Sequence, residues 1–225
     1  HADDEGMVVP PKIAPYQIVI VPIIKDKTQK EAVLAYAQKL SSALSQQIFD
    51  GEKVRVKVDC RDKESVDKMW EWTRKGTPFV CEVGPRDIAN NALMLRARNK
   101  INTPAWKQIV SVDDFVGSIA QRLEDYHKEL YQTADNRLQK NQRTDIQSVE
   151  QMRAYFSNPN KWLDEEGEKV AFVRGKWCGD LDTLEKMKEM KISIRCIPEN
   201  QSHQEGKCLI TDRPATLDVI YARAY

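Results

Sequence analysis

Apolar runs and helix-like periodicity alternate along the first half of the chain. Residues 16–21 are almost all apolar, which is typical of a central strand that is covered on both faces. Residues 79–83 form a second apolar run between Pro78 and the Gly84–Pro85 pair, and a run bounded in this way predicts a buried strand. Between these two strands, apolar side chains recur at helical spacing over residues 31–48.

Turn and cap residues divide the rest of this half. Thr28 and Glu31 match a capping box at the start of the helix, and Asp50–Gly51 ends it. Further expected elements are strands at 54–58, 92–98 and 106–110, and a short helix at 65–74. At least four strands that alternate with helices indicate an α/β layer architecture.

The second half opens with a long helix that begins at Ser111. Its apolar stripe passes into a mostly charged stretch from 124 to 143, which predicts a helix that leaves the first domain. Thr144 starts another helix, and Asn158–Pro159 ends it. The remaining expected elements are strands at 170–173, 192–197, 208–210 and 217–222 and a helix at 181–190. We therefore predict four segments, which are a connector at 1–14, an α/β domain at 15–112, a bridging helix at 113–143 and a small α/β domain at 144–225.

Composition excludes several classes of protein. Charged residues make up 31% of the chain and hydrophobic residues 41%, which is ordinary for a soluble globular protein. No apolar run approaches the roughly 20 residues that a membrane span needs. Five irregularly spaced cysteines argue against a disulfide framework and for a reducing compartment such as the cytoplasm. Residues 52–107 hold thirteen Lys and Arg against eight Asp and Glu, an excess of five that is compatible with a phosphate-contacting face.

The turn after the second apolar run is a candidate ligand site. Pro85 suits the first position of a helix, so Arg86 and Asp87 are expected at the carboxyl end of a strand and beside a helix N-terminus. Open α/β sheets bind ligands at such places. The alternative is that Gly84 only makes the turn and that Arg86 and Asp87 only pair with each other.

Three motifs resemble one enzyme family. The opening H-A-D-D-E-G-M-V-V-P-P-K-I-A-P-Y-Q-I-V-I-V-P-I resembles the stretch that joins the catalytic and anticodon-binding domains of prolyl-tRNA synthetases of the archaeal and eukaryotic-like type. The central K-G-T-P-F-V-C-E-V-G-P-R-D is similar to the anticodon-domain motif of that family. The segments I-R-C-I-P, G-K-C-L-I-T-D-R-P-A and A-R-A-Y are similar to its extra C-terminal domain.

The resemblance implies an anticodon-binding α/β domain with a mixed central sheet flanked by helices, followed by a small α+β domain. It also implies a class II ligase that makes prolyl-adenylate from ATP and L-proline and transfers proline to tRNA(Pro). The resemblance further implies that the core that binds ATP, Mg²⁺ and proline lies upstream of His1, and the start at His1 rather than Met is compatible with a fragment of something larger. The intact protein is expected to be a cytoplasmic homodimer with no membrane segment.

The resemblance also implies which residues read the last two anticodon bases, both guanines. A carboxylate can accept from guanine N1 and N2, and Arg or Lys can donate to O6 and N7. Lys75, Arg86 and Asp87 match the family at such positions. Thr73 stands where the family has an acidic residue, and Val80 stands where it has a basic one.

Three charged residues nearby are candidates to replace the two lost readers. They are Glu71, Arg74 and Glu82. The loss leaves a second hypothesis open, which is a non-catalytic RNA-binding or regulatory paralogue of the same domain. A third hypothesis, a stand-alone small-molecule α/β enzyme, has no Ser-His-Asp set, glycine-rich phosphate loop or metal cluster to support it. Cys81 could serve such an enzyme as a nucleophile, but a mid-strand Cys is far more often inert core.

Many relatives hold a structural zinc ion with four cysteines in the C-terminal domain. Cys178 and Cys208 match the first member of each Cys pair, and Thr183 and Thr211 stand where the partners should be. Two thiolates make a poor tetrahedral site. His203 is a possible third ligand, but a solvated loop histidine is the default. We expect no zinc.

The last residue has a role in the family as well. The terminal Tyr of relatives reaches toward the catalytic site, and Tyr225 matches it. The alternative for Tyr225 is a packed aromatic side chain on the last strand.

Overall fold

The computed structural model describes residues 1–24, 26–157 and 172–223. They divide into two compact units, His1–Gln132 and Thr133–Tyr225. The division falls within helix α4 (Val112–Lys140), which is the region predicted to bridge two domains.

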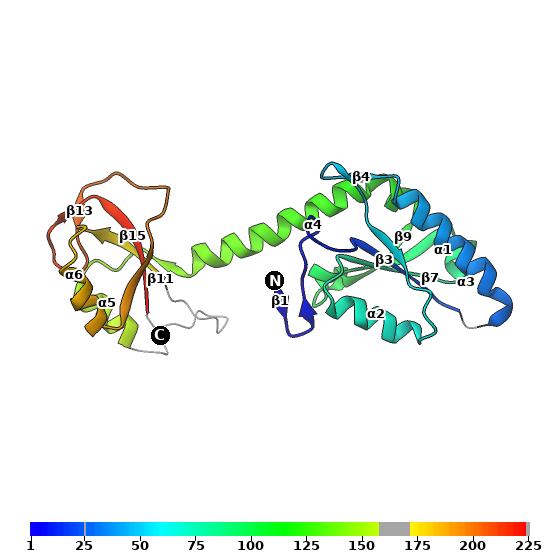
Figure 1. The fold of residues 1–225 in the computed structure, drawn as a ribbon, viewed down its shortest axis with the longest axis horizontal. Coiled ribbons are helices and arrows are strands. Elements are labelled where there is room, and N and C mark those ends of the chain that lie inside the picture. Colours follow the sequence, from blue (N-terminus) through cyan, green and yellow to red (C-terminus); the bar gives the residue numbers. More distant parts are fainter. Residues whose placement is uncertain (25, 158–171, 224–225) are drawn as a thin grey trace. The chain divides into compact units, whose positions relative to one another are not determined.

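A five-stranded sheet forms the centre of the first unit (Figure 1). In chain order its strands are β3 (Ile18–Pro22), β6 (Val56–Val58), β7 (Phe79–Val83), β8 (Ala92–Ala97) and β9 (Lys107–Ser111). The spatial order is β6-β3-β7-β8-β9. β3 is parallel to both β6 and β7, whereas β8 is antiparallel to β7 and β9. The expectation of a mixed central sheet is therefore confirmed.

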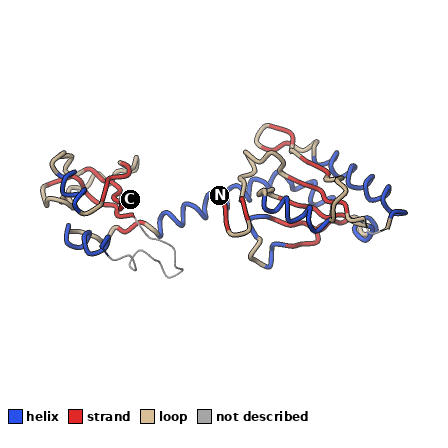
Figure 2. Tube along the Cα trace, turned by 60° about the horizontal axis from the view of Figure 1, so that its bottom comes forward, coloured by secondary structure: helices blue, strands red, loops and turns tan. Residues whose placement is uncertain are grey.

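Helices cover both faces of this sheet (Figure 2). α1 (Lys30–Leu44) and the first half of α4 pack on one face, and α2 (Ser65–Arg74) packs on the other. β7 alternates between the two cores. Phe79, Cys81 and Val83 join α1 and α4, whereas Val80 joins Met69 and Trp72 of α2. α3 (Pro85–Ala89) connects β7 to β8.

The face that α2 covers is open toward the β9 edge. Leu93 and Leu95 of β8 point into the α1 and α4 core, so Met94 and Arg96 lie on the opposite face. α2 packs on β3 and β7. Ile109, the partner of Met94 on β9, is 72% exposed. Part of the sheet surface is therefore left accessible beside α2.

Several predicted boundaries were wrong in the first unit. Thr28 does not cap the helix. Instead, Asp26 accepts from the Thr28 N–H at 2.9 Å and caps a short 3₁₀ turn (Lys27–Gln29) that precedes α1. α1 also ends earlier than predicted, and Ile48 lies in a hairpin formed by β4 (Ile48–Phe49) and β5 (Glu52–Lys53). Trp106 belongs to a 3₁₀ turn (Pro104–Trp106) rather than to β9.

The first residues form a hairpin instead of a plain connector. β1 (Ala2–Asp3) pairs with β2 (Gly6–Met7), and this hairpin lies against the turn between α2 and β7. Gly6 has a φ of +121°, and a Cβ at this position would lie 2.6 Å from the Arg74 carbonyl oxygen. Gly76 has a φ of +76°, and its Cβ would lie 2.8 Å from the Met7 carbonyl oxygen. Only glycine fits both positions.

The second unit contains a four-stranded sheet in the order β10-β11-β15-β12. Its strands are β10 (Gln142–Arg143), β11 (Phe172–Trp177), β12 (Ile192–Cys196) and β15 (Leu217–Arg223). α5 (Val149–Ser157) and α6 (Thr183–Glu189) supply Met152, Tyr155 and Met187 to its core. A short hairpin, β13 (Gly206–Lys207) with β14 (Pro214–Ala215), completes the described part.

The predictions for this unit need two corrections. Ser148, not Thr144, caps α5, because its Oγ accepts from the Gln151 N–H at 3.2 Å. The strand expected at 208–210 is a buried turn, which is closed by a hydrogen bond from the Asp212 N–H to the Cys208 carbonyl at 2.9 Å. The expected helix stop at Asn158–Pro159 and the terminal Tyr225 lie outside the described residues. No helix among the described residues is long and apolar enough to cross a membrane.

Arg98 provides a test of the first unit. It is 1% exposed and donates to the Thr73 carbonyl at 3.0 Å, to the Gly6 carbonyl at 3.0 Å and to Asp3 Oδ2 at 2.8 Å. We expect Arg98→Met to destabilise the first unit by about 3 kcal/mol, because two buried carbonyls and a carboxylate would lose their hydrogen-bond donor. Amide hydrogen exchange of β7 and β8 measures this change.

Arg122 is the matched control for this experiment. It lies on α4 and pairs with Asp114, which is largely exposed. Arg122→Met is expected to cost less than about 1 kcal/mol. Equal losses in the two variants would contradict the structural role of Arg98.

Candidate nucleic-acid interface

A buried carboxylate anchors the outer side of α2. Asp59 follows β6 directly and is 1% exposed. It accepts from Arg61 Nε at 2.9 Å, from Arg61 Nη2 at 2.6 Å and from Trp72 Nε1 at 2.7 Å. The hydrogen bonds from Arg61, assisted by that from Trp72, hold the pKa of Asp59 well below its usual range. Asp59 therefore fixes both the indole of Trp72 and the guanidinium of Arg61.

Three cations surround the ring of Trp72. Lys75 Nζ lies 4.6 Å from the ring centroid, Lys57 Nζ lies 5.5 Å away, and Arg61 Cζ lies 5.8 Å away. Each distance is within the range of a cation–π interaction. Lys57 also lies over the ring of Tyr16, at 5.0 Å. Cationic and aromatic groups thus alternate along this side of the sheet.

Glu71 partly neutralises the same cations. Its carboxylate accepts from Lys75 at 3.0 Å, from Arg61 at 3.1 Å and from Lys63 at 3.3 Å. These hydrogen bonds, that of Arg61 first, lower the pKa of Glu71 to about 2. Lys57 makes no ion pair with any carboxylate in the part of the chain that the structure describes.

A second cluster lies where α2 meets the open part of the sheet. Arg96 of β8 places Nε and Nη2 each 2.8 Å from Glu82 Oε2 of β7. The guanidinium lies 5.4 Å from the ring centroid of Trp106, and the rings of Trp106 and Trp70 lie 6.3 Å apart. Both Trp rings are half-buried. An aromatic pair beside an Arg–Glu pair is a surface on which a base can stack and be recognised.

The predicted turn lies at the carboxyl end of β7. Pro85 occupies the first position of α3, as expected, and Asp87 Oδ2 accepts from the Gly84 N–H at 2.8 Å. The carboxylate is therefore engaged in capping. Among the described residues, Arg86 and Asp87 form no ion pair with each other, which removes the alternative that they only pair together. Arg86 is exposed at a cleft of about 430 Å³ that Ile23 also lines.

A larger cavity lies at the carboxyl ends of β3 and β6. Its volume is about 730 Å³. The cationic residues that line it are Lys27, Lys30, Arg61, Lys63 and Lys68, and the acidic ones are Asp59, Asp62 and Glu64. Five cations against three carboxylates give the lining of this cavity a small positive excess, which can meet phosphates.

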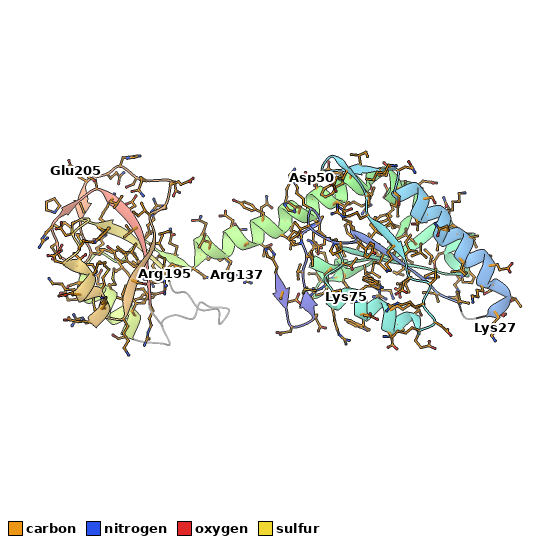
Figure 3. The ribbon with its side chains drawn as sticks, in the orientation of Figure 1. Lys27, Asp50, Lys75, Arg137, Arg195 and Glu205 are labelled. Atoms are coloured by element: carbon orange, nitrogen blue, oxygen red, sulfur yellow. The ribbon has the colours of Figure 1, made fainter. Side chains whose placement is uncertain are left out.

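The residues predicted to read RNA do not form one cluster. Lys75 precedes β7, at the end of α2 beside the β1–β2 hairpin (Figure 3), whereas Arg86 follows β7. Five residues of extended strand separate the two ends by roughly 16 Å. One nucleotide base cannot contact both residues.

Comparisons with known proteins identify the family. Residues 17–122 match a family model described as "Anticodon binding domain", and residues 163–225 match one described as "Prolyl-tRNA synthetase, C-terminal". The whole chain aligns with proline--tRNA ligases of Protochlamydia amoebophila at 41% identity and of Paramagnetospirillum magneticum at 39%. The chain belongs to the prolyl-tRNA synthetase family. It spans 44% and 43% of the lengths of these two relatives.

Membership in the prolyl-tRNA synthetase family confirms the resemblance carried by the three motifs. Thr73 and Val80 stand where the resemblance led us to expect charged residues. Thr73 is 1% exposed and donates to the Met69 carbonyl at 2.9 Å, and Val80 is 2% exposed in the core under α2. Neither side chain is placed to touch RNA directly. Of the proposed substitutes, Glu71 and Glu82 are held by cations, and Arg74 is exposed.

Three of the four positions at which the resemblance led us to look for zinc ligands, Cys178, Cys208 and Thr211, come together in the second unit. Cys178 Sγ lies 3.7 Å from Thr211 Oγ1. Thr183 Oγ1 accepts from Trp177 Nε1 at 2.8 Å and donates to the Asp180 carbonyl at 2.6 Å, so it is already satisfied. No group of three His, Cys, Asp or Glu side chains that could hold a metal occurs among the described residues. Two thiols and two hydroxyls do not fit a zinc ion.

His203 is exposed in a loop, and Cys208 is buried in the turn at 208–210.

Sequence reasoning missed three members of the interface. They are Trp70, Trp106 and Arg96. Arg96 had a detectable signal, because a charged residue at an alternate position of an apolar strand requires a partner on that face. The two Trp residues had none, because their contact depends on how α2 and a 3₁₀ turn pack together.

Acid stability tests the anchor at Asp59. Its folded pKa is below the unfolded value, so its contribution is complete at pH 7 and is lost as the pH falls below about 4. We expect Asp59→Asn to be less stable than the parent at pH 7 by about 2 kcal/mol and to lose less stability between pH 5 and pH 2. Urea unfolding followed at several pH values measures both effects.

Asp62→Asn is the control, since Asp62 is exposed and makes no ion pair with the described residues. Parallel stability curves for the parent and Asp59→Asn would exclude the anchoring role of Asp59.

Proposed function

We infer that this chain binds tRNA(Pro) through the anticodon loop and forms the tRNA-recognition part of a prolyl-tRNA synthetase. The observation that carries this proposal is the surface beside α2, which combines exposed cations, half-buried Trp rings and an Arg–Glu pair. It lies within the segment that matches the anticodon-binding family model. Single-stranded RNA loops are recognised by this combination of stacking and edge contacts.

Each end of β7 has its own part in this proposal. Lys75, which is half-exposed beside Trp72, contacts one nucleotide of the loop. Arg86 contacts another from the opposite end, where Asp87 keeps the turn in shape by capping Gly84. The cations that line the large cavity contact phosphates of the RNA.

The intact enzyme, by the same proposal, ligates L-proline to tRNA(Pro). It does so with ATP through prolyl-adenylate, and ATP and its Mg²⁺ are bound by a catalytic domain outside these 225 residues. The enzyme acts as a homodimer in the cytoplasm. Names of the relatives support the reaction, because each is a proline--tRNA ligase that is more than twice as long as this chain.

Binding of the 225-residue chain to RNA tests the proposal. The probes are a tRNA(Pro) transcript and the same transcript with both anticodon guanines changed to adenine. We expect weaker binding to the changed transcript and a steep loss of affinity with rising salt. If Lys75 and Arg86 contact base edges, Lys75→Ala and Arg86→Ala should each reduce the difference in binding free energy between the two transcripts by roughly 1–3 kcal/mol.

Lys128→Ala is the matched control, because Lys128 lies on the exposed side of α4 and pairs only with Glu124 among the described residues. Equal binding of both transcripts by the parent chain would favour a non-catalytic RNA-binding or regulatory paralogue. A flat salt response would contradict the phosphate contacts.

A further inference from the structure

The basic side chain that the family motif places after Phe79 has a counterpart on the neighbouring strand. Val80 and Arg96 are direct partners in the antiparallel β7–β8 pair. Such partners have Cβ atoms about 4.5–5.5 Å apart and lie on the same face of the sheet. Val80 packs with Met69 and Trp72, so this is the face that α2 partly covers. Arg96 therefore places a guanidinium beside the position from which the family's basic side chain projects.

The contacts of Arg96 orient it without using all of its hydrogen-bonding capacity. Both bonds to Glu82 involve a single carboxylate oxygen, Oε2. Among the described residues, no hydrogen bond engages Glu82 Oε1 or Arg96 Nη1. The pair is largely shielded from solvent, but 13% of the Arg96 side chain and 9% of the Glu82 side chain remain exposed. One donor and one acceptor of the pair therefore remain unused by the described residues.

This arrangement matches one edge of guanine. Guanine presents the acceptor O6 next to the donor N1–H, whereas adenine presents a donor next to an acceptor at the same places. Arg96 can donate to O6 while Glu82 accepts from N1–H. With adenine, the Arg96 donor would face the N6 donor and the Glu82 acceptor would face the N1 acceptor, so neither hydrogen bond would form. Trp106, 5.4 Å from the guanidinium, and Trp70 next to it provide aromatic surface for stacking.

We propose that Arg96 and Glu82 form a guanine-reading pair, in which β8 supplies the cationic reader that this chain lacks at position 80. The proposal rests on the function inferred above, since it assigns one anticodon guanine to a particular pair of side chains. Partial shielding from water strengthens each contact and raises the cost of a mismatched base.

Base analogues test this proposal directly. The 225-residue chain is titrated with synthetic tRNA(Pro) anticodon stem-loops that carry guanine, inosine or adenine at each of the last two anticodon positions. Inosine keeps O6 and N1–H, so it should bind as guanine does. Adenine should bind roughly tenfold to a hundredfold more weakly at the position that the pair reads. Arg96→Gln should bring that ratio close to one and leave the ratio at the other position unchanged.

Two further variants separate reading from a general effect. Glu82→Gln should also narrow the guanine-to-adenine ratio, because its amide can donate to adenine as well as accept. Arg122→Gln, on the opposite side of the sheet, should leave the ratio as it is in the parent. Thermal unfolding of each variant identifies any that fails to fold, and Arg96→Lys then replaces Arg96→Gln, with the ratio again expected to narrow because the planar fork is lost.

The outcomes distinguish this inference from the function on which it rests. A parent chain that binds guanine and adenine stem-loops equally would overturn both. A parent preference that persists in folded Arg96 and Glu82 variants would overturn the guanine-reading pair alone. An equal loss of affinity for all stem-loops in Arg96→Gln, with a salt slope reduced by about one, would make Arg96 a phosphate contact instead.

Discussion

The pairing of β7 on both edges is the constraint on which the interface depends. All five residues of β7 are buried between β3 and β8, and they alternate between two cores. Glu82 brings a carboxylate into this strand, and the register with β8 brings Arg96 within reach of it. A slip of one residue in that register would turn Arg96 toward the apolar core of α1 and α4. The chemistry of the surface beside α2 is therefore set by strand pairing rather than by a loop.

Charge on this surface is organised by carboxylates that lie beneath or beside the cations. Asp59 fixes Arg61 from below, and Glu71 gathers Arg61, Lys63 and Lys75 from the side. Such pairs reduce the long-range field that an excess of five positive charges would otherwise produce, but they hold each cation in a defined place. An RNA loop would therefore meet oriented donors in preference to a diffuse positive patch, an arrangement that favours recognition of particular bases.

The sequence predicted the strands with long apolar runs and the helices with clear periodicity. β7 and α2 have the predicted bounds, and those of β7 follow from Pro78, Gly84 and Pro85, which leave the chain little freedom on either side of the strand. The prediction failed where a local signal had a competitor. Asp26, and not Thr28, caps the turn before α1. Residues 208–210 have the composition of a strand, but they form a turn whose backbone hydrogen bond is local. Motif reasoning proposed Lys75 and Arg86 and placed them before and after the strand, but it did not consider Arg96, whose contact with Glu82 joins residues fourteen positions apart in sequence.

The hairpin at the start of the chain has a mechanical consequence. Gly6 and Gly76 allow two backbones to touch where any side chain would hold them apart, and Arg98 links the hairpin to the last turn of α2. Lys75 lies in that same turn. The hairpin can therefore be displaced only if the α2–β7 turn moves with it or if the hydrogen bonds of Arg98 break. The position of Lys75 is in this way tied to the fold of residues 1–9.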